Sequence, residues 1–119
     1  MSDDTIFHRI LRREIPADIV YEDDHVFAFR DIAPQAPVHV LFVPKASVPT
    51  LDAATPGQAE LVGRLALAAA EYARKEGFAE DGYRVVINCN GHGGQTVFQL
   101  HLHLLAGAPL GRFGTPAHQ

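Results

Sequence analysis

Polar and apolar residues alternate in the segment Gln99–Leu105 near the C-terminus. Successive side chains of a β-strand point to opposite faces, so this pattern predicts that Gln99, His101 and His103 share one face. The opposite face is expected to be buried through apolar side chains, namely Phe98, Leu100, Leu102 and Leu104. Neighbours on one face lie roughly 6.5 Å apart, so two imidazoles can engage one small group. Three polar side chains in register on so apolar a strand indicate a functional site.

Hydrophobic spacing predicts two helices. A short one is expected over Thr5–Arg13, with acidic residues (Asp3 and Asp4) at its N-terminal end and an apolar stripe of Ile6, Phe7, Ile10 and Leu11. A long helix is expected from Thr55 to Gly77, because Thr55 and Gln58 form a capping-box pattern and Gly77 is a typical terminator. Its predicted buried stripe comprises Leu61, Val62, Leu65, Ala69, Tyr72 and Ala73.

Five strands are predicted, over Ile19–Glu22, His25–Arg30, Val38–Val43, Tyr83–Asn88 and Thr96–Leu105. Residues 31–37 contain two prolines and residues 90–95 three glycines, so both segments are expected to be loops. This order favours an α+β fold, a five-stranded, mostly antiparallel sheet with the helices on one side. We expect one domain over residues 1–119, with a C-terminal tail at 108–119.

Composition excludes several classes of protein. The net charge of −4 argues against a nucleic-acid binder, which needs a basic face. No apolar run approaches the ~20 residues of a membrane span, and the acidic N-terminus does not resemble a signal peptide. Cys89 is the one cysteine, which suits a reducing compartment, and we expect a cytoplasmic protein.

His101 and His103 can carry chemistry together. A neutral imidazole can attack an electrophile and leave again, which suits displacement through a covalent intermediate. A second imidazole, if protonated, offers a donor and positive charge to developing oxyanions. The alternative is a zinc site formed by His39, His101 and His103, and spacing alone does not separate the two. The other histidines (His8, His25, His92 and His118) are expected to be solvated.

The glycine-rich segment before the last strand is a weaker signal. Backbone N–H groups at Gly91, Gly93 and Gly94 can approach an anion closely, but a flexible connection explains the glycines equally well. Asn88 and Thr96 flank this segment and offer uncharged donors. No lysine or arginine occurs from residue 85 to residue 107, so a site here suits one phosphate better than a triphosphate.

Most of the chain, from about Thr5 to Gly107, resembles the histidine triad (HIT) family, and in particular its nucleotide-binding protein branch. The similarity is carried by several separate segments, namely Ile6-Phe7, Glu14-Ile15-Pro16-Ala17, Glu22-Asp23-Asp24, the run from Ala28 to His39, and Gly93-Gly94-Gln95-Thr96. The resemblance implies a HIT fold and a purine nucleoside phosphoramidate hydrolase that acts at the α-phosphorus and releases AMP or GMP. The resemblance also implies a homodimer, and an activity that needs neither a metal nor another cofactor.

The resemblance also implies roles for individual residues. His101 matches the nucleophile that forms a nucleotidyl-histidine, His103 the last triad histidine at the phosphate oxygens, and His39 the histidine that closes the site. Asp31 matches the acceptor of both ribose hydroxyls. The remaining matches are phosphate-side groups at Asn88, Gly94 and Thr96 and an apolar slot for the base formed by Ile6, Phe7, Ile10, Phe29 and Ile32.

Two positions depart from the family pattern. Gln99 stands where the triad begins with histidine, and an amide cannot carry a proton at neutral pH. A nucleotide-binding or scaffolding module with little turnover is therefore the alternative function. Relatives often have a tryptophan near the C-terminus, whereas this chain has none and places Arg112 and Phe113 there.

Overall fold

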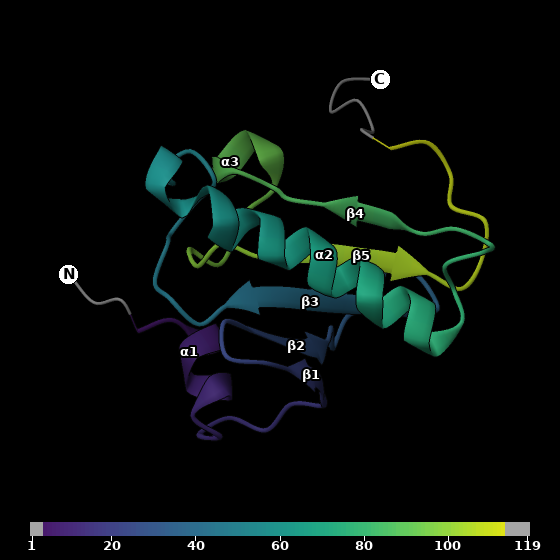
Figure 1. Ribbon diagram of the computed structural model, residues 1–119, viewed down its shortest axis with the longest axis horizontal. Helices are drawn as coiled ribbons and strands as arrows, with labels where there is room; N and C mark the ends of the chain where they lie inside the picture. The colour runs from purple at the N-terminus through teal and green to yellow at the C-terminus, as the bar shows by residue number, and fades with distance from the viewer. Residues whose placement is uncertain (1–3, 114–119) are drawn as a thin grey trace.

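The computed structural model describes residues 4–113 of the chain. The helices are α1 (Ile6–Leu11), the 3₁₀ turn η1 (Pro56–Gln58), α2 (Ala59–Glu76) and α3 (Asn90–Gly93), and the strands are β1 (Ile19–Glu22), β2 (Val26–Arg30), β3 (Val38–Pro44), β4 (Arg84–Val86) and β5 (Leu102–Ala106) (Figure 1). The expectations for Asp3, for His118 and for the end of the tail lie outside the described residues.

The five strands form one sheet in the order β1-β2-β3-β5-β4, and every adjacent pair is antiparallel. This confirms the predicted α+β fold with a five-stranded sheet. β5 lies between β3 and β4, where Leu41 is opposite His103 on one side and Val86 is opposite it on the other. His103 is therefore paired on both sides, on the strand next to the β4 edge of the sheet.

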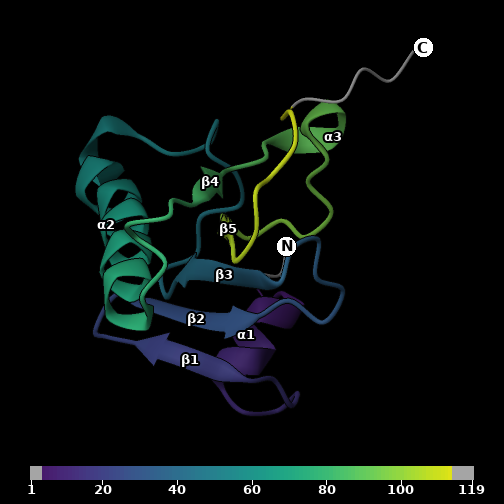
Figure 2. The same cartoon turned by 90° about the vertical axis from the view of Figure 1, so that its right-hand side faces the viewer.

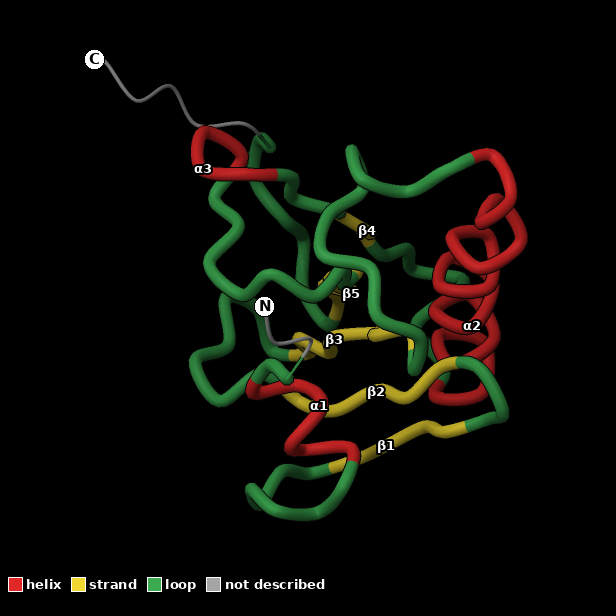
Figure 3. Tube along the Cα trace, turned by 90° about the vertical axis from the view of Figure 1, so that its left-hand side faces the viewer, coloured by secondary structure: helices red, strands yellow, loops and turns green. Residues whose placement is uncertain are grey.

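The helices α1 and α2 cover opposite faces of the sheet, so the prediction that the helices lie on one side is wrong (Figures 2 and 3). β2 shows why, because its side chains alternate and are apolar in both directions. Val26 and Ala28 pack with α2, whereas Phe27 and Phe29 pack with α1. A sheet that is apolar on both faces needs a cover on each, and α1 supplies the second cover.

Capping interactions set the helix ends. Thr5 caps α1 and forms a capping box with His8. His8 is buried, with its Nε2 3.4 Å from Ser47 Oγ, so the expectation of a solvated side chain is wrong for this histidine. Thr55 and Gln58 form the predicted capping box, and Gly77 ends α2 in the left-handed conformation. α1 stops at Leu11, two residues before the predicted end.

The last strand and the segment before it differ from the prediction. β5 begins at Leu102 rather than at Thr96, and residues 96–101 approach it as irregular backbone. Strict alternation therefore fails at its N-terminal end, where Phe98 is 49% exposed and Gln99 is buried. The glycine-rich segment contains the short helix α3 instead of a loop, and β4 covers only the middle of its predicted range. In the part of the chain that the structure describes, no helix has the length and apolarity to cross a membrane.

Candidate active site

His101 lies one residue before β5 and is held by its own neighbourhood. Its Nδ1 is 2.7 Å from the carbonyl oxygen of Gln99, and the Phe7 ring meets it edge-on at a centroid distance of 4.9 Å. A carbonyl oxygen only accepts hydrogen bonds, so the neutral imidazole must carry its proton on Nδ1. The lone pair of neutral His101 is therefore on Nε2.

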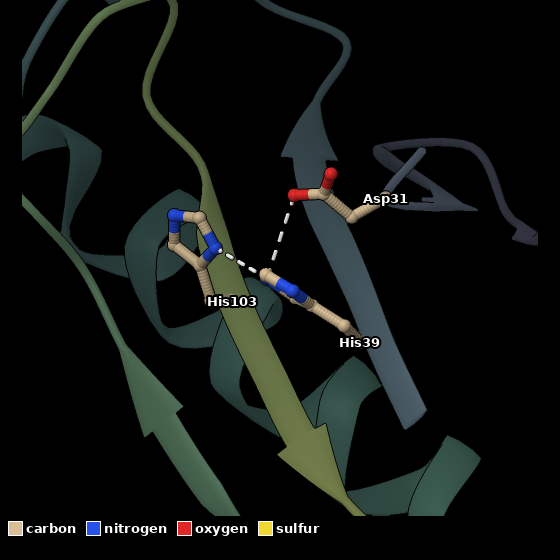
Figure 4. Close-up of side chains that lie close together, drawn as sticks. All are labelled: Asp31, His39 and His103. Carbon is tan, nitrogen blue, oxygen red and sulfur yellow. Dashed lines mark hydrogen bonds and ion pairs between the residues drawn. The ribbon is translucent and has the colours of Figure 1, made fainter. Parts of the chain in front are cut away.

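His103 joins His101 to a second pair of polar residues. The rings of His101 and His103 have a centroid distance of 5.1 Å, and His103 Nδ1 is 2.9 Å from Nε2 of His39. His39 Nε2 in turn lies 3.5 Å from Asp31 Oδ2 (Figure 4). The contact between His39 and His103 joins residues 64 positions apart, because β3 and β5 are neighbours in the sheet.

Backbone contacts decide the tautomers of this pair. The N–H of Gln35 donates to His39 Nδ1 at 3.0 Å, so the proton of neutral His39 is on Nε2. That N–H donates to Nδ1 of His103, which leaves His103 with its proton on Nε2. The two triad histidines thus present opposite functions on the same ring atom, since Nε2 of His101 is an acceptor and Nε2 of His103 a donor.

Burial keeps all three imidazoles neutral. It is the largest cause of the lowered pKa of His101 and of His39, opposed by the Gln99 carbonyl at His101 and by Asp31 at both. For His103 burial and the neighbouring His101 and His39 lower the pKa to about 4. At neutral pH His103 therefore supplies a hydrogen-bond donor rather than the positive charge considered for a protonated second imidazole.

A cavity of about 410 Å³ opens beside the two histidines. It is mostly apolar, and Asp31 is its only charged lining residue among those the structure describes. The predicted residues on its wall are Ile6, Phe7, Ile10, Phe29, Asp31, Ile32, Thr96, His101 and His103. A second hollow of about 460 Å³ lies near the end of α2, and among the described residues that line it Asp81 alone has a titratable side chain. The titratable groups thus favour the histidine cavity as the site.

Four predicted site residues lie outside this cavity wall. His39 is buried behind His103. Asn88 and Gly94 lie next to each other, since a Cβ added to Gly94 would be 4.0 Å from Asn88 Nδ2. Gln99 is the clear correction, because its side chain does not share the histidine face. Its amide instead binds backbone groups of residues 44–48.

Sequence reasoning missed five lining residues, namely Ile15, Pro16, Ala17, Leu41 and Val97. Leu41 could have been found, since it is two positions from His39 on the same face of β3. Ile15, Pro16 and Ala17 follow α1 in an irregular segment, where no periodicity indicates direction. Val97 lies in the irregular approach to β5, for which a regular strand had been predicted.

The donor pattern does not suit a resident metal. Asp31, His39 and His103 offer ligand atoms within 4.8 Å of one another, a different trio from the one considered above. A metal on His39 Nε2 would require the imidazole proton to move to Nδ1. There it would face the Gln35 N–H, a donor, whereas metal-bound histidines normally place an acceptor at the second nitrogen.

Comparison with known proteins shows the family of this chain. The family model of the HIT domain matches residues 12–110. The chain belongs to the HIT family. A HIT family hydrolase from Legionella pneumophila is 43% identical in sequence and superposes with a TM-score of 0.86 over 89% of this chain and 95% of that one. A histidine triad protein from Clostridium difficile gives 39% identity and a TM-score of 0.90 over 96% and 99% of the two chains.

A curated relative adds the chemistry. The purine nucleoside phosphoramidase of Escherichia coli K12 is 53% identical over 111 residues, 93% of each chain. Together with the hydrolase structures, this similarity shows that the chain is an enzyme of the HIT type. His39, His101 and His103 lie within the residues that the HIT family model matches.

Proposed function

We propose that this chain hydrolyses purine nucleoside 5′-phosphoramidates through a covalent nucleotidyl intermediate on His101. The observation that carries the proposal is the Nδ1–H of His101 on the Gln99 carbonyl, which leaves an unprotonated Nε2 beside the cavity. The activity named for the Escherichia coli relative supports the substrate class. The apolar wall formed by Phe7, Phe29 and Ile32 suits a base, and Asp31 suits ribose hydroxyls.

The reaction balances with water as its only co-reactant. In the first step His101 Nε2 forms a bond to the α-phosphorus while the phosphorus–nitrogen bond breaks, and the leaving nitrogen takes up a proton from solvent to depart as an amine. The donor N–H on His103 Nε2 stabilises the phosphate oxygens during this transfer. In the second step water attacks phosphorus, the bond to His101 breaks, and the proton of the water replaces the one consumed. The products are the amine and AMP or GMP.

The cavity favours conjugates of a single phosphate. Its described wall contains no lysine or arginine, and the three imidazoles are neutral at pH 7. A triphosphate would bring several negative charges to a site whose one formal charge is the carboxylate of Asp31. We therefore propose AMP and GMP conjugates, rather than free nucleoside triphosphates, as substrates.

The test compares the natural protein with His101→Ala and with His92→Ala, which removes an exposed histidine outside the cavity. Adenosine 5′-phosphoramidate is the substrate, and released AMP is measured. We expect turnover by the natural protein and by His92→Ala, and its loss in His101→Ala. Rapid quenching into base, followed by mass spectrometry, should place the added AMP on the peptide that contains His101. Equal release of AMP by all three proteins would exclude His101 as the nucleophile.

The alternative of a binding module with little turnover rests on Gln99, whose amide cannot carry a proton. The position of this side chain weakens that argument. The side chain at position 99 points away from the cavity wall, so a missing proton carrier there does not touch the reacting atoms. Binding of AMP without turnover of the phosphoramidate would still favour this alternative.

We also propose a homodimer joined through β4. This strand forms one edge of the sheet, and Val85 at its centre is 42% exposed. An exposed apolar edge strand is a template for pairing with a second copy. On α2, Leu67 is 72% exposed and offers further apolar surface. Sedimentation of the natural protein should give twice the chain mass and Val85→Lys should shift it toward the monomer, whereas a natural monomer would exclude the dimer.

A further inference from the structure

Gln99 is 1% exposed, and its side chain makes three hydrogen bonds to one backbone segment. Its Nε2 donates to the carbonyl oxygens of Pro44 at 3.0 Å and Ala46 at 2.7 Å. Its Oε1 accepts from the N–H of Val48 at 3.1 Å. Both amide hydrogens and the amide oxygen are thus used, and all three partners lie between Pro44, the last residue of β3, and Val48.

These hydrogen bonds join the two segments beyond the end of the pairing between β3 and β5. The register between β3 and β5 runs from Val38 opposite Ala106 to Phe42 opposite Leu102, and Gln99 lies beyond it. The backbone N–H of Leu100 donates to the Val48 carbonyl at 2.7 Å, and the Gln99 amide adds three ties between the same two segments. The position of Gln99 therefore depends on its own side chain.

The main chain of Gln99 reaches the reacting residue. Its carbonyl oxygen accepts the Nδ1–H of His101 at 2.7 Å, the contact that places the lone pair on Nε2. We propose that Gln99 is a positioning residue whose buried amide clamps residues 44–48 and thereby holds its carbonyl against Nδ1 of His101. This inference rests on the proposed nucleophilic role of His101. It assigns Gln99 to the orientation of the nucleophile and not to proton delivery.

Glutamine suits this position better than histidine or glutamate. A neutral imidazole has one donor and one acceptor, so it cannot serve two carbonyls and one N–H together. A carboxylate can accept from Val48 but would face the carbonyl oxygens of Pro44 and Ala46 without a hydrogen to donate. Each substitution therefore loosens the clamp in a different and recognisable way.

The test uses Gln99→Glu with Gln95→Glu as its matched control. Gln95 is 5% exposed and makes the same set of bonds, since its Oε1 accepts from Asn90 N–H and its Nε2 donates to the carbonyls of Pro49 and Val97. Both variants lose comparable hydrogen bonds, but only Gln99 carries the carbonyl on His101. Melting temperatures of both variants establish that any losses of stability are comparable.

For Gln99→Glu we expect kcat for the phosphoramidate to fall by on the order of 10–100-fold, with KM little changed, because a misplaced nucleophile slows the chemical step. Its rate relative to the natural protein should rise as the pH is lowered, since a protonated carboxyl regains one donor. Gln95→Glu should show no such rise in its own ratio. In ¹⁵N–¹H spectra, the Nδ1–H signal of His101, assigned by its absence in His101→Gln, should weaken in Gln99→Glu and persist in Gln95→Glu.

Two results would overturn the proposal. One is equal behaviour of the Gln99 and Gln95 variants in kcat, pH dependence and the Nδ1–H signal, which would make Gln99 a purely structural residue. The other is a higher kcat for Gln99→His than for the natural protein, which would assign position 99 to proton delivery. We expect a lower kcat for this variant. Gln99→His also replaces Gln99→Glu in the test if Gln99→Glu does not fold. Because the spectra need no turnover, a protein that loses the signal with Gln99 but hydrolyses no phosphoramidate would refute the proposed function and retain the positioning role.

Discussion

Lowering the pH should destabilise the protein through His103 before most carboxylates titrate. The pKa of His103 is about 4 in the folded chain against an ordinary value of 6.5. Between these values the unfolded chain binds a proton on this imidazole and the folded chain does not, so stability falls as the pH falls. From pH 7 to pH 5 this linkage amounts to about 2 kcal/mol from His103 alone.

The substitution His103→Gln isolates this effect. It removes the titrating ring but leaves a side chain able to accept from Nε2 of His39. Urea unfolding at pH 7 and pH 5 gives the free energy of unfolding for both proteins by linear extrapolation. The natural protein should lose about 2 kcal/mol more between the two pH values than the variant does.

Comparing each protein with itself at two pH values removes the cost of the lost contacts, which is present at both. His39 and His101, whose pKa values burial also lowers, add to the pH dependence of both proteins in the same direction. Equal losses in the two proteins, within about 0.5 kcal/mol, would show that His103 is not kept neutral by the fold.

Three further predictions concern His101, Asp31 and Gly107. Because the pKa of His101 is lowered, the acid limb of kcat/KM should have its midpoint below pH 6.5, and a midpoint at or above that value would contradict a buried neutral nucleophile. In the natural protein, removal of the 2′-hydroxyl from the substrate should reduce kcat/KM by about 10- to 100-fold, whereas in Asp31→Asn the same removal should change kcat/KM little. Equal losses in the two proteins would show that Asp31 does not recognise the ribose. Gly107→Ala should lower the free energy of unfolding by more than about 1 kcal/mol, because φ is +97° and the new Cβ would lie 2.9 Å from Pro37 Cβ. Gly111→Ala, with open space around it, should leave thermal unfolding nearly unchanged, and a similar small effect at both glycines would refute the argument.

Local patterns were sufficient for the elements and for much of the cavity wall. The capping box of Thr55 and Gln58 begins the 3₁₀ turn η1, which leads into α2 at Ala59, and Gly77 ends α2. These signals depend on neighbours a few positions apart. Alternation placed His101 and His103 on the face opposite Leu102 and Leu104, because side-chain direction in extended backbone is a local property. The resemblance to the HIT family then predicted which residues would hold a base and a ribose.

The site's chemistry depended on contacts between distant segments. Whether Gln99 points toward the cavity or toward residues 44–48 is decided where the regular ladder ends, and no local pattern records that end. The tautomers of His39 and His103 follow from a backbone N–H and from a pairing across two strands.

The sequence by itself determined which residues can form helices and strands and which imidazoles share a face, because those properties arise within a few residues. Only the tertiary structure decided that both sheet faces are covered, that the Gln99 amide binds residues 44–48, and that His101 is left with its lone pair on Nε2. The physical reason is that a hydrogen bond between segments depends on where both partners come to lie, and that is a property of the whole fold.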